Sequence, residues 1–184
     1  MKRVLLGIFL LWPALASANH LYIGLAQYRL KQTSEALISF RAAVECNPKL
    51  VAAQLAIGDA YETRGNEGEA LAAYLQALNL EPKNAPALRA ASNLYLKNGL
   101  HTKALPLLET LIEVTPAQVD VRADLGASYA AAGNRKRAEA QFRKALELEP
   151  DYFPALAGLG NLLCFGLAIG LAPGGGRSTG VVSK

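Results

Sequence analysis

The sequence predicts an all-α fold, a solenoid of stacked antiparallel helix pairs, and two observations lead to that prediction. Residues with a fixed structural role recur every 34 positions, and the apolar residues between them follow helical spacing. Glycine and proline fall where each expected helix would end. A unit of this length cannot bury a core alone, so neighbouring units must stack. The period gives about four and a half units.

Residues 1–18 have the layout of a secretory signal peptide. Lys2 and Arg3 form a basic end, an apolar stretch follows, and residues 16–18 supply the small side chains that a signal peptidase requires. We expect cleavage before Asn19, and hence a periplasmic or secreted protein. The alternative is an uncleaved membrane anchor, but thirteen apolar residues fall short of the roughly 20 that a spanning helix needs.

Charge and cysteine content exclude two classes of protein. The formal charge is +4 at pH 7, and it falls to +2 if Lys2 and Arg3 are removed. This charge is too small and too dispersed for a nucleic-acid-binding surface. Cys46 and Cys164 lie several units apart, so we expect no disulfide framework, and Cys46 occupies an apolar core position.

Residues 51–84 show how each repeated residue acts. The first helix, expected over 52–64, ends at Gly65, which adopts left-handed backbone geometry without steric cost. The second helix, expected over about 69–80, ends before Pro82, because proline disfavours helical geometry at the preceding residue and lacks an N–H donor. The series that share the period are Pro48, Pro82, Pro116 and Pro150; Gly65, Gly99 and Gly133; Ala36, Ala70, Ala104 and Ala138; Gly24, Gly58, Ser92, Gly126 and Gly160; and Tyr61, Tyr95 and Tyr129.

Small residues are expected to set how closely the two helices of a unit approach. Gly58 on the first helix should face Ala70 on the second, which lets the helix axes pack near the short end of the roughly 8 to 10 Å range.

These residues resemble the tetratricopeptide repeat (TPR) family. Units 51–84 and 119–152 both place Leu or Ile before Gly, then Tyr, Ala, an aromatic residue, Ala and Pro in the family's order. The resemblance covers residue 19 to about 165 and implies a right-handed superhelix. It divides the chain into a signal peptide at 1–18, repeats at 19–50, 51–84, 85–118 and 119–152, a partial fifth repeat or capping helix at 153–172, and a disordered Gly-rich tail at 173–184.

Repeat 1 departs from the family pattern at two positions. Lys31 stands where glycine is expected, and Gln27 stands where tyrosine is expected. A left-handed backbone at Lys31 would cost roughly 1 to 2 kcal/mol.

The resemblance places the functional surface on the concave side of the superhelix. First-helix residues spaced three to four apart share one helical face and line this groove. The stripe is apolar and aromatic in repeat 1, mixes acids with bases in the middle, and is lined by alanine in repeat 4. We expect a peptide or a partner helix as ligand, with an apolar anchor at the repeat-1 end; the alternative is that these are ordinary solvated side chains. The groove residues are Leu21, Leu25, Tyr28, Arg29, Leu55, Asp59, Glu62, Arg89, Asn93, Leu96, Lys97 and Ala127. In repeat 4, Ala123 and Ala130 continue the same stripe, and Asp124 flanks it.

No pattern of catalytic or metal-binding residues is present in the sequence. His20 and His101 lie in different units, so neither a zinc site nor a nucleophile–histidine triad is expected. The clamp with which chaperone-binding TPR proteins hold peptide carboxylates would need Lys and Asn at Leu21 and Leu25. We therefore expect no enzyme, no cofactor, no metal and no chaperone-tail binding.

The segment from Phe153 to Leu171 is apolar all round, and it departs from the repeat where a second helix should follow. Three interpretations stay open: a half-repeat that caps repeat 4, an exposed surface for a second copy or a membrane, or a reading frame cut short after about residue 165. The glycines at 166 and 170 argue against a robust spanning helix.

Two functions follow from the sequence. The first is an adaptor that binds a protein or peptide within a cell-envelope assembly. The second is a self-associating or membrane-attached module that uses the apolar C-terminal helix.

Overall fold

The computed structural model describes residues 2–170 of the 184, with side chains for 15–164, and the predicted tail at 173–184 lies outside the described residues. Within residues 2–170 the chain forms nine helices and no strand. The helices are α1 (Lys2–Arg29), α2 (Thr33–Cys46), α3 (Val51–Thr63), α4 (Glu67–Leu80), α5 (Ala85–Lys97), α6 (His101–Val114), α7 (Val119–Ala131), α8 (Arg135–Leu148) and α9 (Phe153–Gly170).

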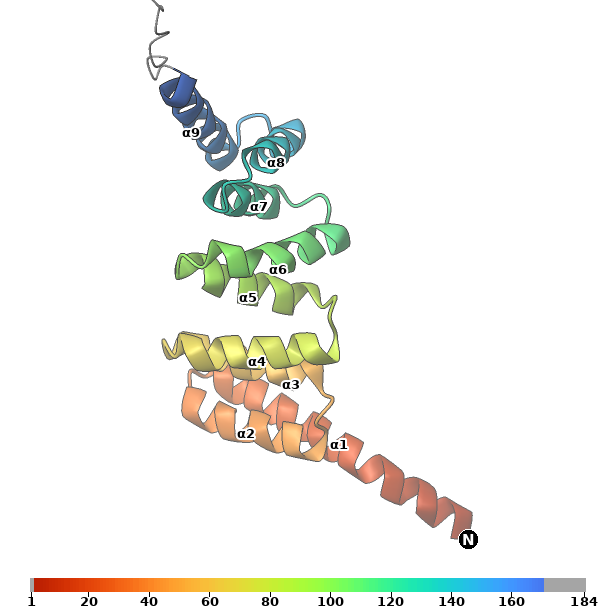
Figure 1. Cartoon of the computed structure of the whole chain (residues 1–184). Helices are drawn as coiled ribbons and strands as arrows, with labels where there is room; N and C mark the ends of the chain where they lie inside the picture. The colour runs from red at the N-terminus through yellow and green to blue at the C-terminus, as the bar shows by residue number, and fades with distance from the viewer. Residues whose placement is uncertain (1, 171–184) are drawn as a thin grey trace, which may run out of the picture.

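The helices stack in chain order as four pairs, with α9 alone after the last pair (Figure 1). Each first helix packs against its own second helix, and each second helix packs against the first helix of the next pair. The predicted all-α solenoid is confirmed. Helix α1 runs without a break through the predicted signal peptide and into repeat 1, and its first part projects away from the stack.

Helix boundaries follow the glycine and proline positions closely. The expected helix over 52–64 forms at Val51–Thr63. The expected helix over 69–80 begins two residues earlier, at Glu67, because Gly68 in the first turn does not prevent helical geometry.

The turn inside each pair needs a left-handed residue. Gly65, Gly99 and Gly133 adopt φ values of 76°, 69° and 76°, and Lys31 adopts φ 61° at the same place in repeat 1. The expected left-handed backbone at Lys31 is confirmed. A residue that has a Cβ atom is strained in this conformation, whereas glycine is not.

An aromatic ring covers the glycine in the middle of most first helices. A Cβ added at Gly58 would lie 2.3 Å from the ring of Tyr74, so the predicted partner Ala70 was wrong. Ala70 is fully buried one turn away from this contact. Phe40 covers Gly24 and Phe142 covers Gly126 in the same way. Repeat 3 replaces both partners together, with Ser92 and Leu108 at the two positions, and both are buried.

The buried side chains form two adjoining clusters that run along the stack. One extends from Val51 to Ala155, and the other joins α2 to α3 around Phe40. Among the helices of the described residues, none combines the length and the apolar character needed to cross a membrane.

We predict that Lys31→Gly raises the free energy of unfolding by about 1 kcal/mol, because glycine removes the cost of the left-handed backbone. Urea unfolding followed by circular dichroism measures the change. Gly65→Ala is the matched control of opposite sign, since a Cβ at Gly65 meets nothing within 4 Å and only the backbone is strained. Equal stability of Lys31→Gly and the parent chain would show that this turn carries no strain.

Candidate functional site

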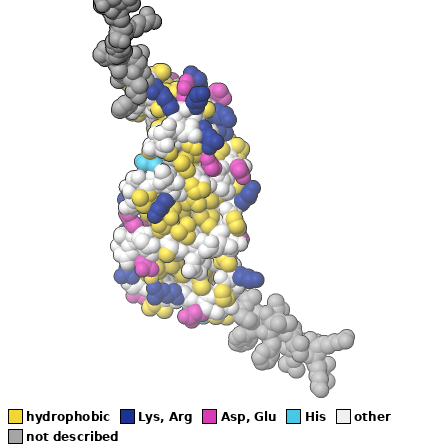
Figure 2. All heavy atoms as spheres, viewed as in Figure 1, with side chains coloured by type: hydrophobic (Ala, Val, Ile, Leu, Met, Phe, Trp, Pro, Cys, Tyr) yellow, Lys and Arg dark blue, Asp and Glu magenta, His cyan; other side chains and the backbone are white. Residues whose placement is uncertain are grey.

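The predicted groove residues all lie on the first helices α1, α3, α5 and α7. Half of them are exposed: Arg29, Asp59, Glu62, Asn93, Lys97 and Ala127. The other half are partly buried against the core: Leu21, Leu25, Tyr28, Leu55, Arg89 and Leu96. Figure 2 shows one face of the stack, on which apolar side chains form a band bordered by charged groups. The stripe therefore mixes partly buried side chains that stabilise the fold with exposed side chains that a ligand can reach.

Asp59 and Glu62 meet at one hydroxyl group. The Tyr74 hydroxyl lies 2.7 Å from Oδ1 of Asp59 and 2.9 Å from Oε2 of Glu62. A phenol has one proton, so it satisfies one carboxylate at a time. Burial raises the pKa of Asp59; the hydrogen bond from Tyr74 offsets part of this, and the charge of Glu62 adds to it. The pair leaves negative charge unbalanced on this face.

The two bases in the middle of the face are already paired. Arg89 Nη1 lies 2.6 Å from Oδ2 of Asp120, and the guanidinium also donates to the Gln118 side chain. Burial raises the pKa of Asp120, but the hydrogen bond from Arg89 and contacts with the backbone outweigh it and lower the pKa overall. Lys97 Nζ lies 2.6 Å from Oε1 of Glu67, which raises the pKa of Lys97 and lowers that of Glu67.

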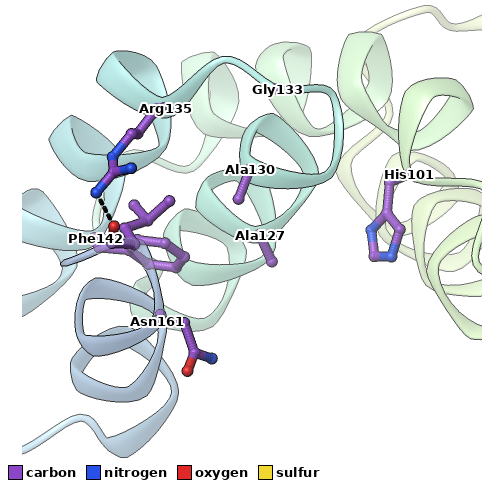
Figure 3. A pocket seen from close by; sticks show the side chains of 9 residues that line it. His101, Ala127, Ala130, Gly133, Arg135, Phe142 and Asn161 are labelled. Atoms are coloured by element: carbon purple, nitrogen blue, oxygen red, sulfur yellow. Dashed lines mark hydrogen bonds between the residues drawn. The ribbon is translucent and has the colours of Figure 1, made fainter. Parts of the chain in front are cut away.

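A hollow of about 670 Å³ opens between α7 and α9. Its lining is mostly apolar and includes Ala127, Ala130, Phe142 and Leu162. Figure 3 shows the two alanines on α7 lying between His101 of α6 and Asn161 of α9. The Phe142 ring also packs against Gly126 and Gly158, so the residue that closes repeat 4 supports α9 beside the hollow.

Polar groups stand at the rim of this hollow. Nδ1 of His101 is buried and has no hydrogen-bond partner in the described structure. Arg135 donates to the carbonyl oxygen of Leu162 and holds the start of α8 to α9. Next to His101, burial raises the pKa of Asp124, the charge of Asp120 adds to this, and Arg89 and His101 lower it. Asp124 is a desolvated carboxylate without a hydrogen bond in the described part of the chain.

A second, smaller hollow of about 520 Å³ lies on repeat 1 and includes Leu25 and Arg29. Tyr28 is not free to act as an anchor there. Its hydroxyl lies 2.5 Å from Oγ1 of Thr63 and 3.3 Å from the carbonyl oxygen of Asp59, so it ties α1 to α3.

Most residues that line the larger hollow were not predicted from the sequence. Among the residues predicted on the concave face, only Ala127 and Ala130 line it. Asn161 could have been found, because it lies 34 residues after Ala127, at the same place in the repeat. Phe142 and Leu162 could not, since their role depends on how α8 and α9 meet. No group of three or more His, Cys, Asp or Glu side chains able to hold a metal ion occurs among the described residues.

The stacked helix pairs and the groove define a helical-repeat protein of the interaction-scaffold class. The chain belongs to the tetratricopeptide repeat family, whose profiles match residues 23–88, 55–119 and 95–163. No curated protein sequence matches the chain significantly.

Solved structures of two TPR proteins resemble the fold. A crystal structure of MamA is 18% identical with a TM-score of 0.73, over 84% of this chain and 85% of that one. YrrB, described as a TPR protein with an unusual peptide-binding site, is 20% identical with a TM-score of 0.74, over 80% and 76% of the two chains. MamA from Desulfovibrio magneticus RS-1 is 18% identical with a TM-score of 0.66, over 83% and 96%. At these identities the likeness shows the fold alone.

We predict that Asp59→Asn raises the free energy of unfolding at pH 7, because ionised Asp59 is disfavoured in the folded chain. A raised pKa in the folded state means that the stability Asp59 contributes is present at low pH and is lost as pH rises through that pKa. Asparagine cannot ionise and keeps an oxygen acceptor for the Tyr74 hydroxyl.

Urea unfolding between pH 4 and pH 7 measures the effect, with Asp151→Asn at an exposed loop as control. The stability gain of Asp59→Asn should shrink as the pH falls toward about 4, where the unfolded carboxyl protonates. A gain that is constant with pH would contradict the assignment.

Proposed function

We propose that this chain is a non-catalytic scaffold that binds an extended peptide of a partner protein along its first-helix face. A bulky apolar side chain of the peptide occupies the hollow between α7 and α9, and a Lys or Arg of the peptide lies beside Asp124. The observation that carries this proposal is an apolar hollow lined by Ala127, with the partly buried carboxylate of Asp124 one helical turn earlier on α7; this carboxylate has no hydrogen bond among the described residues.

The hollow has room for a large apolar side chain together with neighbouring atoms of the peptide, and its lining is mostly apolar. Its volume of about 670 Å³ falls within the range of roughly 300 to 1,000 Å³ that is usual for ligand sites, which are mostly apolar with a few polar groups. The exposed side chain of Asn161 offers hydrogen bonds to a peptide backbone at the rim. We place the anchor here and not at repeat 1, because this hollow is larger and Tyr28 is already engaged.

The charges of the face favour a basic peptide. Arg89 and Lys97 are each committed to a carboxylate. Asp59 and Glu62 share one hydroxyl donor, and Asp124 has no hydrogen bond among the described residues. A cationic side chain would balance this negative charge, and it would steer the partner toward the groove.

Panning a phage-displayed library of random twelve-residue peptides against the chain tests this proposal. We expect a consensus with a large apolar residue followed within a few positions by Lys or Arg. Ala127→Trp fills the hollow and should weaken the selected peptides at least about tenfold in fluorescence anisotropy. Asp124→Asn should weaken them less and reduce the salt dependence.

Ala140→Trp, on the exposed side of α8 in the same repeat, is the matched control and should bind as the parent chain does. An acidic consensus, or peptides that bind Ala127→Trp unchanged, would refute the proposed site.

We also propose that the scaffold is exported and acts in a cell-envelope assembly. The support is the basic, apolar and small-residue layout of residues 1–18. Expressed in a bacterium with a secretion system, the protein should appear in the periplasmic fraction with Asn19 at its N-terminus by Edman sequencing. Ala16→Arg together with Ala18→Arg should block processing, while Ala26→Arg, beyond the site, should not. A cytoplasmic product that begins with Met1 would contradict export.

Self-association through the last helix is a second candidate function. Phe153, Leu156 and Leu163 of α9 are exposed, although the corresponding faces of the earlier first helices are covered. Contiguous apolar surface of this kind marks an interaction site.

A further inference from the structure

The first helix of the stack has an apolar face without a cover. In repeats 2 to 4 the third, seventh and tenth residues of each unit are buried under the second helix of the preceding unit, with exposures of 0 to 8%. These residues are Ala53, Ile57, Ala60, Ala87, Ala91, Leu94, Val121, Leu125 and Ser128. The corresponding residues of α1 are Asn19, Ile23 and Ala26, and all three are exposed. Tyr22 on the same face is 69% exposed, whereas its counterpart Ala56 is 7% exposed.

Helix α9 has a face of its own that no described residue covers. Gly160 lies 34 residues after Gly126, yet a Cβ added there would meet nothing within 4 Å. Phe153 is 77% exposed and Leu163 is 61% exposed, whereas their counterparts Val119 and Tyr129 are buried. A second helix with a ring over the glycine is what covers this face in repeats 1, 2 and 4.

The uncovered face of α1 carries the pattern of a second helix. Every second helix has alanine, then a ring or leucine four residues later, then an aliphatic residue after four more: Ala36, Phe40 and Val44; Ala70, Tyr74 and Leu78; Ala104, Leu108 and Ile112; Ala138, Phe142 and Leu146. Helix α1 repeats this spacing with Ala18, Tyr22 and Ala26, of which Tyr22 and Ala26 lie beyond the proposed cleavage site and remain in the exported chain. Residues four apart share one helical face, so Tyr22 presents its ring as Tyr74 does.

We propose that copies of this chain bind head to tail, with α1 of one copy against the face of α9 in the next copy that no described residue covers. In this contact the Tyr22 ring covers Gly160, as Tyr74 covers Gly58 within repeat 2. Helices α1 and α9 lie at opposite ends of the stack (Figure 1), so the contact joins two different surfaces. Such an interface propagates into filaments or rings. The proposal rests on the self-association candidate and is independent of peptide binding in the groove.

Two variants of the full chain test the contact, and each blocks only one of its two surfaces. Gly160→Trp fills the place beside α9 and leaves α1 intact, whereas Tyr22→Asp puts a charge on α1 and leaves α9 intact. Among the described residues nothing lies within 4 Å of a Cβ added at Gly160, and Tyr22 is exposed, so both variants should fold. Gly68→Trp is the control for the first, since a Cβ at Gly68 is also in open space. Ile38→Asp is the control for the second, being 69% exposed on α2.

Molar mass by light scattering across a concentration series provides the test. The parent chain and both controls should grow beyond a monomer as concentration rises, and each variant alone should stay monomeric. An equimolar mixture of the two variants should give twice the monomer mass and no more, because only one productive contact remains between them.

A parent chain that is monomeric at several hundred micromolar overturns both the proposal and the self-association candidate. A parent that assembles, with variants that assemble equally well or a mixture that stays monomeric, overturns only the head-to-tail contact. Peptide binding measured on the two variants reports on the groove separately and should be unchanged.

Discussion

Three of the four helix pairs depend on one contact, in which an aromatic ring of the second helix covers a glycine of the first. At Gly58 a single added carbon would lie 2.3 Å from the Tyr74 ring, so the backbone itself forms the surface against which the ring packs. Aromatic side chains bury more apolar area than any other kind, and this contact brings the helices close while it does so. In repeat 3 the two positions change together. Ser92 is larger than the glycine of the other repeats, its partner Leu108 is smaller than their aromatic residue, and both are buried.

The same contact produces the candidate site. Phe142 closes repeat 4 over Gly126, and its far side supports Gly158 of α9, which places Asn161 and Leu162 across from the alanines of α7. Small residues on α7 leave the hollow open, since nothing larger than a methyl group projects into it from that helix. Elsewhere on the face the ion pairs of Arg89 and Lys97 lie near the surface, where such pairs contribute little to stability.

The sequence predicted the fold in detail because each element of a repeat is fixed by local chemistry. The left-handed turn at Lys31 followed from the period alone, and the helix ends followed from glycine and proline to within two residues. The partner of Gly58 could not be read in the same way, because Ala70 and Tyr74 lie one turn apart on the same face and only the crossing of the helices decides between them. The hollow could not be predicted from the sequence for a similar reason, because it exists only where α7, α8 and α9 meet.

Repetition also explains why the two ends of this stack expose surfaces that are distinct from its groove. Every inner unit has two buried faces, and a terminal unit that keeps the inner pattern exposes one of them. Helix α1 keeps apolar residues on its outer face, and α9 keeps the glycine whose ring is missing. The groove uses other positions of the same helices, such as Asp59 and Ala127, so an end contact leaves it open. In the proposed head-to-tail assembly the grooves of successive copies would recur along one filament, and a partner with several binding segments would gain affinity from each additional copy.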